Sequence, residues 1–312
     1  MPGFVGRGIT CAYGHRRPAT LIFREIAKAG SISGAARALG WTQPAVSQHL
    51  ARLEREAGGP LLLRGPGGVT LTEAGTVLLR RAHVVAAELH AAAEELAALA
   101  QLEAGRVRLV SFPTAAATLV PEALGALADE HPEIEVELHE AEPPEALAAV
   151  AAGDADLALV FGYDGPPADL GPLVWRRLLD EPVHLVLPPG SRAPDRRGLA
   201  AFEDADWIAG CIRCRTHLID ICTQAGFTPA IRHTTDDYVV VQNLVARGLG
   251  VTVLPDSALS PYRHPAVRVI PMRSLGRRHV GVAHRPGGET VPATAALLQQ
   301  IARAALSAAP SR

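Results

Sequence analysis

Residues 31–54 constrain the fold most strongly, because their pattern predicts two short helices joined by a tight turn. Ser31 or Ser33 can cap the first helix, and the apolar residues that follow recur at helical spacing. Gly40 comes where a chain leaving a helix needs a positive φ. Thr42 can then cap the second helix, so the segment is predicted to be a helix-turn-helix hairpin.

The second helix of this hairpin carries hydrogen-bonding side chains on the face opposite its apolar residues. Val46, Leu50 and Leu53 recur at core spacing. The outward residues are Gln43, Ser47, Gln48, His49 and Arg52. Gln and Arg are side chains that read base edges, and Ser and Thr suit phosphates. The pattern predicts a helix that lies in a DNA groove, although a helical hairpin inside a larger α fold has the same spacing.

Charge is distributed unevenly along the chain. Residues 1–81 contain 11 Lys and Arg against 4 Asp and Glu, and the remaining residues contain 19 against 28, so a net charge of −2 conceals a basic N-terminal part. This asymmetry is expected when one end of a protein contacts phosphates. It favours the DNA-binding interpretation of the hairpin.

A β-hairpin and a long helix are predicted to follow. Residues 61–71 form two short extended runs around a Gly/Pro turn, with Arg64 placed to reach a phosphate. Thr72 and Glu73 open a helix that continues to about Glu103. Its apolar residues are spaced by four and three residues: Leu78, Ala82, Val85, Leu89, Ala92, Leu96 and Leu99. This seam predicts pairing with a second helix, although a helix packed on its own domain can look similar.

These segments resemble the LysR-type transcriptional regulators. The matching segments are Gly30–Ser33, Ala35–Ala36, Gln43–Ser47, Leu53–Glu54, Pro60–Leu62, Leu71–Gly75 and Gly248–Pro255, and the resemblance covers about residues 20–306. It implies that Gln43, Pro44, Ser47 and Gln48 read bases, while Ser31, Thr42, Arg52 and Arg64 contact the DNA backbone. Ser33 completes the candidate DNA-binding set. Many relatives carry Arg where this chain has Gln48, a difference expected to change the preferred operator.

From Arg106 onward, strands are predicted to alternate with helices. The expected strands are 107–112, 134–139, 156–161, 184–187, 207–209, 231–235, 251–254, 267–272 and 278–284, and the expected helices are 115–130, 144–152, 216–225, 236–246 and 292–307. The βαβαβ order predicts parallel sheets covered by helices. The resemblance further implies two lobes like those of type 2 periplasmic binding proteins, joined by two crossover strands.

The fold class expected is therefore α/β, with an N-terminal winged helix-turn-helix domain dominated by helices. The expected parts are an N-terminal extension (1–19), the winged helix-turn-helix (20–78), a linker and dimerisation helix (73–103) and an effector-binding domain (106–306), with lobe I at 106–180 and 266–306 and lobe II at 181–265.

Candidate effector-binding residues follow from the strand order, since α/β sheets bind ligands at the carboxyl ends of their strands. The candidates are Ser111, Phe112, Thr114, Phe161, Tyr163, Cys211, Arg213, Thr235 and Asp236. Ser111, Thr114 and Arg213 lie at predicted helix N-termini and favour a small anion, with a carboxylate as the candidate effector. Each can instead be an ordinary helix cap or a solvated surface residue.

Three cysteines provide an alternative. Cys211, Cys214 and Cys222 lie close together in sequence beside His217. A Cys-x-x-Cys pair can switch by forming a disulfide, and neighbouring arginines lower thiol pKa values. No second pair completes a four-ligand zinc site, so no metal or cofactor is expected. The alternative to an effector-binding regulator is a regulator that senses redox state through these thiols.

Catalysis is not expected, because the chain lacks a Gly-rich phosphate loop and a Gly-x-Ser-x-Gly nucleophile turn. A solute-binding protein without a DNA role is a further alternative, but it would lack the basic N-terminal part and would need an export signal. No apolar run is long enough to span a bilayer. The expected location is the cytoplasm, with the nucleoid. The expected partners are operator DNA, a small-molecule effector and further copies of this chain as a dimer or tetramer, with RNA polymerase as a candidate.

Overall fold

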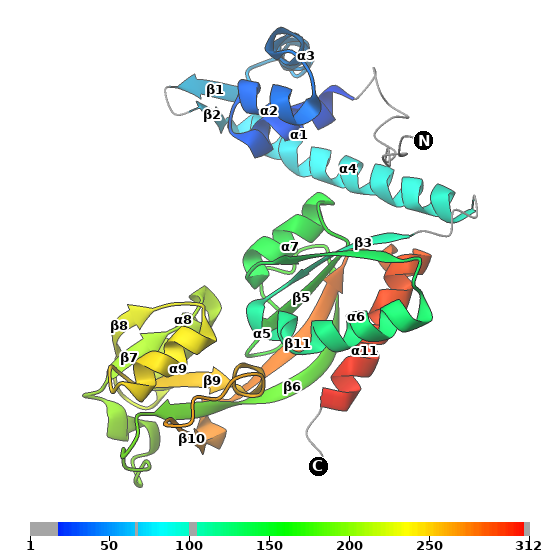
Figure 1. Cartoon of the computed structure of the whole chain (residues 1–312). Coiled ribbons are helices and arrows are strands. Elements are labelled where there is room, and N and C mark those ends of the chain that lie inside the picture. The colour runs from blue at the N-terminus through cyan, green and yellow to red at the C-terminus, as the bar shows by residue number, and fades with distance from the viewer. Residues whose placement is uncertain (1–17, 66–67, 100–104, 309–312) are drawn as a thin grey trace, which may run out of the picture. The chain divides into compact units, whose positions relative to one another are not determined.

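The computed structural model describes residues 18–65, 68–99 and 105–308 (Figure 1). The chain divides near residue 101 into two compact units, an N-terminal unit and a C-terminal unit. The expected N-terminal extension lies almost wholly outside the described residues, as does Cys11.

In its described residues, the N-terminal unit combines four helices with a two-stranded hairpin (Figure 1). Its elements are α1 (Ala19–Ala29), α2 (Ile32–Leu39), α3 (Gln43–Glu56), β1 (Leu62–Gly65), β2 (Gly68–Leu71) and α4 (Glu73–Leu99). The core gathers the apolar faces of α1, α2 and α3, where Phe23, Ala35 and Leu50 are almost fully buried. The predicted helix-turn-helix and wing are confirmed.

The turn between α2 and α3 has one of its two predicted side-chain caps. Ser31 accepts a hydrogen bond from the Gly34 amide at 3.1 Å, and Gly40 has a φ of 68°. The prediction that Thr42 caps α3 is wrong, because its side chain makes no cap hydrogen bond. Pro44 at the second helical position has no N–H to donate, and the Thr42 side chain does not bond the remaining candidate, the Ala45 amide.

Three contacts fix the wing and the start of α4 to the helix-turn-helix. Glu54 of α3 accepts hydrogen bonds from the amides of Leu61 and Leu62, at 3.0 and 3.3 Å. Thr72 caps α4 by accepting from the Gly75 amide at 3.0 Å. A Cβ on Gly75 would lie 2.0 Å from the Leu61 carbonyl oxygen, so only glycine allows α4 to pass this close to the wing.

The described part of α4 extends to Leu99, and residues 100–103 of the predicted helix lie outside the described residues. Along the predicted seam, Ala82 is buried, whereas Val85 and Leu89 are 42% and 38% exposed. Nothing is described of the side chains of Leu96 and Leu99. The proposed pairing of α4 with a second copy stays a prediction.

The C-terminal unit is built around one seven-stranded sheet, in which the order is β10-β6-β11-β5-β3-β4 and β9 also pairs with β6. The strands are β3 (Arg106–Ser111), β4 (Glu135–Glu140), β5 (Leu157–Gly162), β6 (Val174–Leu187), β9 (Thr252–Pro255), β10 (Arg268–Pro271) and β11 (Arg277–His284). A separate parallel pair is formed by β7 (Asp206–Ala209) and β8 (Ala230–Thr234).

Helices cover these strands in two lobes. Lobe I contains α5 (Pro113–Ala116), α6 (Leu119–Glu130), α7 (Pro143–Ala152) and α11 (Pro292–Ala308), and lobe II contains α8 (Ile212–Gln224), α9 (Tyr238–Ala246) and α10 (Asp256–Leu259). Short 3-10 turns span Gly198–Phe202, Arg273–Leu275 and Gly288–Thr290. The core of lobe I includes Leu109, Leu157 and Leu297, and Trp207 and Leu218 belong to the core of lobe II. The predicted two-lobed α/β architecture is confirmed.

The strand β6 differs most from expectation. A strand was predicted only at 184–187, but β6 has 14 residues and serves both lobes. Its first half pairs with β11 of lobe I, and its second half pairs with β9 and β10 of lobe II. These pairings are antiparallel, so the large sheet is mixed rather than parallel. They also place β10 in lobe II, whereas the sequence pattern grouped residues 266–306 with lobe I.

Two helices also differ from the predicted ranges. The helix expected at 115–130 is divided into α5 and α6, because Thr118 has a non-helical φ of −123°. The helix expected from residue 216 begins at Ile212. The earlier start places Cys211 at the N-cap of α8 and Cys214 in its first turn.

Candidate nucleic-acid interface and effector cleft

The predicted DNA-reading residues cluster at the N-terminal end of α3. Gln43, Pro44 and Gln48 are exposed there, and Ser47 is partly exposed. The hydroxyl of Ser33 donates a hydrogen bond to the side-chain oxygen of Gln43 at 3.2 Å, which joins α2 to the start of α3. The structure therefore brings the predicted base-reading side chains together on one accessible surface.

The predicted phosphate-contacting arginines are both exposed. Arg52 pairs with Glu56 at 2.8 Å one helical turn away, and this hydrogen bond raises the pKa of Arg52. Arg64 lies on β1, in the wing. Both side chains of the Arg52–Glu56 pair are exposed, so the pair contributes little to stability.

A pocket of about 60 Å³ lies between the two lobes of the C-terminal unit. Seven of the nine predicted effector-binding residues line it: Phe112, Thr114, Phe161, Tyr163, Cys211, Thr235 and Asp236. They come from the carboxyl ends of strands in both lobes, as the sheet rule predicts. Glu142, Cys214 and Arg278 also line the pocket.

The other two predicted residues do not line this pocket. The hydroxyl of Ser111 is buried and donates to the Phe112 carbonyl oxygen at 3.2 Å. The guanidinium of Arg213 donates to the Phe161 carbonyl oxygen at 3.0 Å and pairs with Asp169. Two of the three groups that suggested an anion site are therefore satisfied within the protein.

The cation that does line the pocket is Arg278, which sequence reasoning missed. Its side chain is almost completely buried and lies over the rings of Phe112 and Phe161, at 4.9 and 4.5 Å. It donates to Glu181 at 2.7 Å and to the Thr114 hydroxyl at 2.7 Å. No local signal distinguishes Arg278 in the sequence, because its partners come from distant segments.

The thiols of Cys211 and Cys214 lie against each other in this pocket. Cys211 donates a hydrogen bond to the Cys214 sulfur, with 3.1 Å between the two Sγ atoms. That distance exceeds a disulfide bond of about 2.05 Å, so both thiols are free. The hydroxyl of Tyr163 also donates to Cys214, at 3.6 Å, and the Tyr163 ring stacks on His217 with 3.7 Å between centroids.

These contacts separate the acidities of the cysteines. The hydrogen bond from Cys211 is the main cause that lowers the pKa of Cys214, with further contributions from Arg278 and the Tyr163 hydroxyl against the effect of burial. The same hydrogen bond raises the pKa of Cys211. Burial raises the pKa of Cys222 to about 12. Cys214 is therefore the one of these three thiols whose pKa is lowered, which favours its thiolate form.

A buried carboxyl group stands beside the pair. One carboxyl oxygen of Glu142 is buried without a hydrogen-bond partner among the described residues. Burial raises the pKa of Glu142, and the neighbouring Cys211 thiol and the charge of Arg278 partly oppose this effect. A protonated Glu142 is a hydrogen-bond donor facing the pocket, which sequence reasoning also missed.

Within the described residues, no three His, Cys, Asp or Glu side chains gather closely enough to hold a metal ion. None of the helices in the described part of the chain is both long and apolar enough to cross a lipid bilayer.

Each of the two units matches a known protein family model. Residues 19–76 match the family model described as the bacterial regulatory helix-turn-helix protein of the lysR family, and residues 100–306 match the LysR substrate binding domain. A probable hydrogen peroxide-inducible genes activator from Streptomyces viridosporus is 31% identical over 276 residues, or 85% of this chain and 86% of the relative. A protein of the same description from Mycobacterium avium is 32% identical, over 76% of each chain.

Solved structures agree on the fold. A full-length OxyR variant from Pseudomonas aeruginosa, with aspartate in place of one cysteine, has a TM-score of 0.64 at 21% identity, with 92% of this chain and 95% of that chain covered. Full-length CbnR in complex with its target DNA has a TM-score of 0.59 at 20% identity, over 92% and 98% of the two chains. The helix-turn-helix match shows that the alternative of a solute-binding protein without a DNA role is wrong. The chain belongs to the LysR family of DNA-binding transcriptional regulators.

Proposed function

We propose that this LysR-type regulator is controlled by reversible oxidation of the Cys211–Cys214 pair in its effector cleft. The observation that carries the proposal is the contact between the two thiols, in which Cys214 accepts a hydrogen bond from Cys211. The same thiol is close enough to the buried guanidinium of Arg278 for that charge to lower its pKa. A thiolate with a resolving thiol beside it is the arrangement of redox-sensing cysteines.

The pocket favours a small neutral oxidant over a carboxylate. About 60 Å³ holds only a few water-sized molecules. Glu142 and Asp236 line the pocket, and Glu181 already neutralises Arg278. An anion would meet these carboxyl groups without a free cation, whereas a hydroperoxide is neutral and compact. The carboxylate effector expected from the sequence is therefore less well supported in this cleft.

The proposed step balances with one hydroperoxide. The Cys214 thiolate attacks an oxygen of the hydroperoxide, the O–O bond breaks, and the departing oxygen takes a proton, for which Glu142 is the candidate donor. The resulting sulfenic acid is then attacked by the sulfur of Cys211. The S–O bond breaks, the S–S bond forms, and water leaves with the proton of Cys211. The two thiols lose two electrons, and the hydroperoxide gains them.

The relatives support this function. Two proteins that are 31% and 32% identical to this chain are described as probable hydrogen peroxide-inducible genes activators. The alternative of a thiol-based regulator, raised from the Cys-x-x-Cys spacing, thereby becomes the preferred function. Its chemistry involves Cys211 and Cys214, whereas Cys222 is fully buried in the core of lobe II.

The DNA-binding step uses two copies of the chain. The exposed residues Val85 and Leu89 on α4 offer an apolar face for pairing. Paired α3 helices would enter successive major grooves of a dyad-symmetric operator, and contacts between C-terminal units would complete a tetramer. Oxidation would favour one arrangement of the lobes and so change the spacing of the paired heads. Regulation rather than catalysis, a cytoplasmic location beside the operator and RNA polymerase as a partner belong to this proposal.

Peptide mass spectrometry of the full-length protein after treatment with hydrogen peroxide tests the function. We expect a Cys211–Cys214 disulfide in the wild type and in Cys222→Ala, and none in Cys214→Ser. Footprints on the DNA beside the protein's own gene should differ between reduced and oxidised wild type but not for Cys214→Ser. Free thiols at Cys211 and Cys214 after peroxide treatment would exclude the redox step while leaving DNA binding intact.

A further inference from the structure

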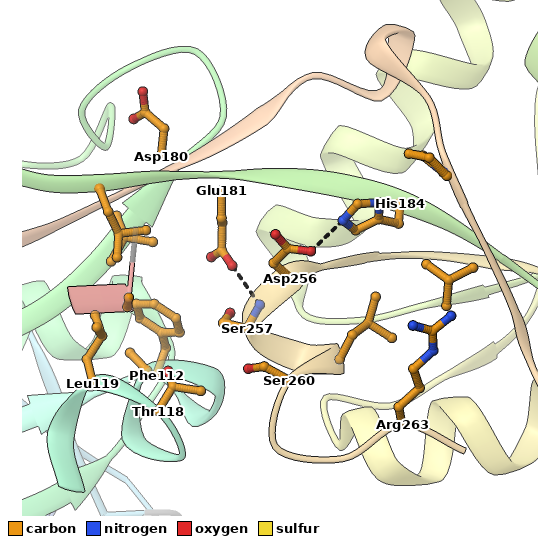
Figure 2. Close-up of a pocket in the computed structure, with 17 residues that line it drawn as sticks. Phe112, Thr118, Leu119, Asp180, Glu181, His184, Asp256, Ser257, Ser260 and Arg263 are labelled. Atoms are coloured by element: carbon orange, nitrogen blue, oxygen red, sulfur yellow. Dashed lines mark hydrogen bonds and ion pairs between the residues drawn. The ribbon is translucent and has the colours of Figure 1, made fainter. Parts of the chain in front are cut away.

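A second and larger cavity, of about 510 Å³, lies in the C-terminal unit beside β6 (Figure 2). Phe112 and Leu119 line it from lobe I, and α10 with the segment that follows it lines it from lobe II. Phe112 is the one residue that it shares with the thiol pocket. Its volume is within the range of small-molecule sites, so it is large enough for a ligand that the thiol pocket excludes.

Each acid on the cavity wall has a polar partner. Glu181 pairs with Arg278, and Asp180 and Asp256 contact the rings of His279 and His184. Arg263 has no carboxylate within ion-pair distance among the residues that the structure describes. It is exposed at the cavity, where Figure 2 shows its guanidinium extending from the segment after α10 toward β6. An incoming anion would therefore meet an uncompensated cation.

Two serine hydroxyl groups also line this cavity. Ser257 accepts a hydrogen bond from Arg278 at 2.6 Å, so its own proton is available to a ligand. Ser260 has no side-chain partner among the described residues. Figure 2 places both serines between the ring of Phe112 and Arg263. The guanidinium of Arg263 is therefore the candidate donor for a carboxylate head, and the serines are polar groups along the path between it and Phe112.

Apart from Thr118, the rest of the wall is apolar. Phe112, Leu119 and Val280 are almost fully buried residues that line the cavity, and Leu179 and Leu259 extend this surface. A ligand that fits both the region at Arg263 and the apolar wall has an anionic head and an apolar tail. We propose that this cavity binds a monocarboxylate with a medium-length alkyl or arylalkyl chain, its head at Arg263 and its tail against Phe112 and Leu119.

The helix α10 connects this site with the thiol pocket. Ser257 lines the larger cavity and the adjacent Ala258 lines the smaller one. The ligand would therefore contact residues of both lobes near the reactive thiols. Binding of this ligand does not require the thiols. A failure of the proposed redox function would therefore leave the proposed ligand site unaffected, and the reverse also holds.

Titration calorimetry of the full-length reduced protein with octanoate tests the proposal. We expect saturable binding of octanoate and much weaker binding of octan-1-ol and of acetate, which lack the head charge and the tail respectively. Arg263→Gln should weaken octanoate binding about tenfold or more, since it removes a charge-assisted contact. Arg247→Gln, at an exposed arginine outside the cavity, is the matched control and should bind as the wild type does.

A charge-reversal variant distinguishes the loss of the head-group contact from a loss of folding, because it should gain binding of a cationic ligand. Arg263→Glu should lose octanoate and gain octylammonium. The Cys211→Ser/Cys214→Ser double variant should keep octanoate binding, which separates this site from the thiol pocket. Equal octanoate affinity in Arg263→Gln and the wild type would overturn the proposal. So would the absence of octanoate binding to the wild type, or an octan-1-ol affinity equal to that of octanoate.

Discussion

Arg278 and Glu181 face each other across β11 and β6, with 2.7 Å between the guanidinium and the carboxylate, and both side chains are almost completely buried. Arg278 also bonds Thr114 of lobe I and Ser257 of lobe II. The pair therefore ties the lobes together between the two pockets. Its position makes it a structural centre of the C-terminal unit.

Removing the charge of Glu181 should destabilise this unit strongly. Glu181→Gln leaves a buried guanidinium without its counter-charge, and we expect a loss of about 3–5 kcal/mol in the free energy of unfolding. The loss in the free energy of unfolding is measured by urea unfolding of the full-length protein, with hydrogen exchange of amides in the C-terminal unit as the readout. The control is Glu203→Gln, whose partner Arg197 is exposed, with an expected effect below about 1 kcal/mol. Equal effects of the two variants would contradict the role given to the pair.

The reactivity of Cys214 should depend on Cys211. The thiolate is the nucleophile, so alkylation accelerates as pH rises through the pKa. Because the pKa of Cys214 is lowered, the wild-type rate should reach its plateau at a lower pH than for an ordinary thiol. Cys211→Ala removes the principal hydrogen bond, so the profile should shift to higher pH and the rate at neutral pH should fall.

Peptide mass spectrometry of iodoacetamide labelling across pH gives this profile. Cys211→Ser retains a donor and should restore part of the shift, while Cys222→Ala should leave the profile unchanged. A Cys214 profile that is the same with and without Cys211 would show that the hydrogen bond does not control the thiol.

Gln48→Ala should reduce specific DNA binding more than non-specific binding. Its side chain is exposed on α3, and a bidentate contact with a base is worth about 1–3 kcal/mol of discrimination. Fluorescence anisotropy with operator and unrelated duplexes at one salt concentration measures both affinities. Gln299→Ala, an exposed glutamine in the other unit, is the control. An unchanged ratio of the two affinities would remove Gln48 from the base-reading set.

Arg64→Ala should weaken binding to both duplexes by similar factors. A phosphate contact carries no sequence information, and its loss reduces the slope of log affinity against log salt by about one. The titrations are repeated over a series of salt concentrations, with Arg247→Ala as the control. A full wild-type slope in Arg64→Ala would mean that the wing does not contact phosphate.

Gly75→Ala should destabilise the N-terminal unit, because the added Cβ would meet the Leu61 carbonyl oxygen. Overpacking of this kind costs about 1–3 kcal/mol. Hydrogen exchange of the amides in α1 to α3 reports the change. Gly59→Ala is the matched control, since its Cβ would meet nothing within 4 Å. Equal protection in the two variants would contradict the close passage of α4 over the wing.

The helix-turn-helix could be predicted from sequence because its signals are local. A cap at Ser31, a positive φ at Gly40 and apolar residues at helical spacing are separated by few residues, and each reports on its own segment. The local error at Thr42 arose at a helix start where Pro44 removes one of the two amides that a side-chain cap can bond. Seven cleft residues were predicted because the ends of parallel strands converge at one edge of a sheet, whatever fills the space between them.

Sequence alone thus determined the family, the kinds of element and most residues of the cleft. Tertiary structure decided what the cleft can do, because the partners that set charge and acidity are far apart in the chain. Arg278 meets Glu181 across 97 residues, and Tyr163 meets Cys214 across 51. The orientation of Arg213 toward Asp169, the sharing of β6 between lobes and the cavity at Arg263 likewise depend on long-range packing, which local patterns do not encode.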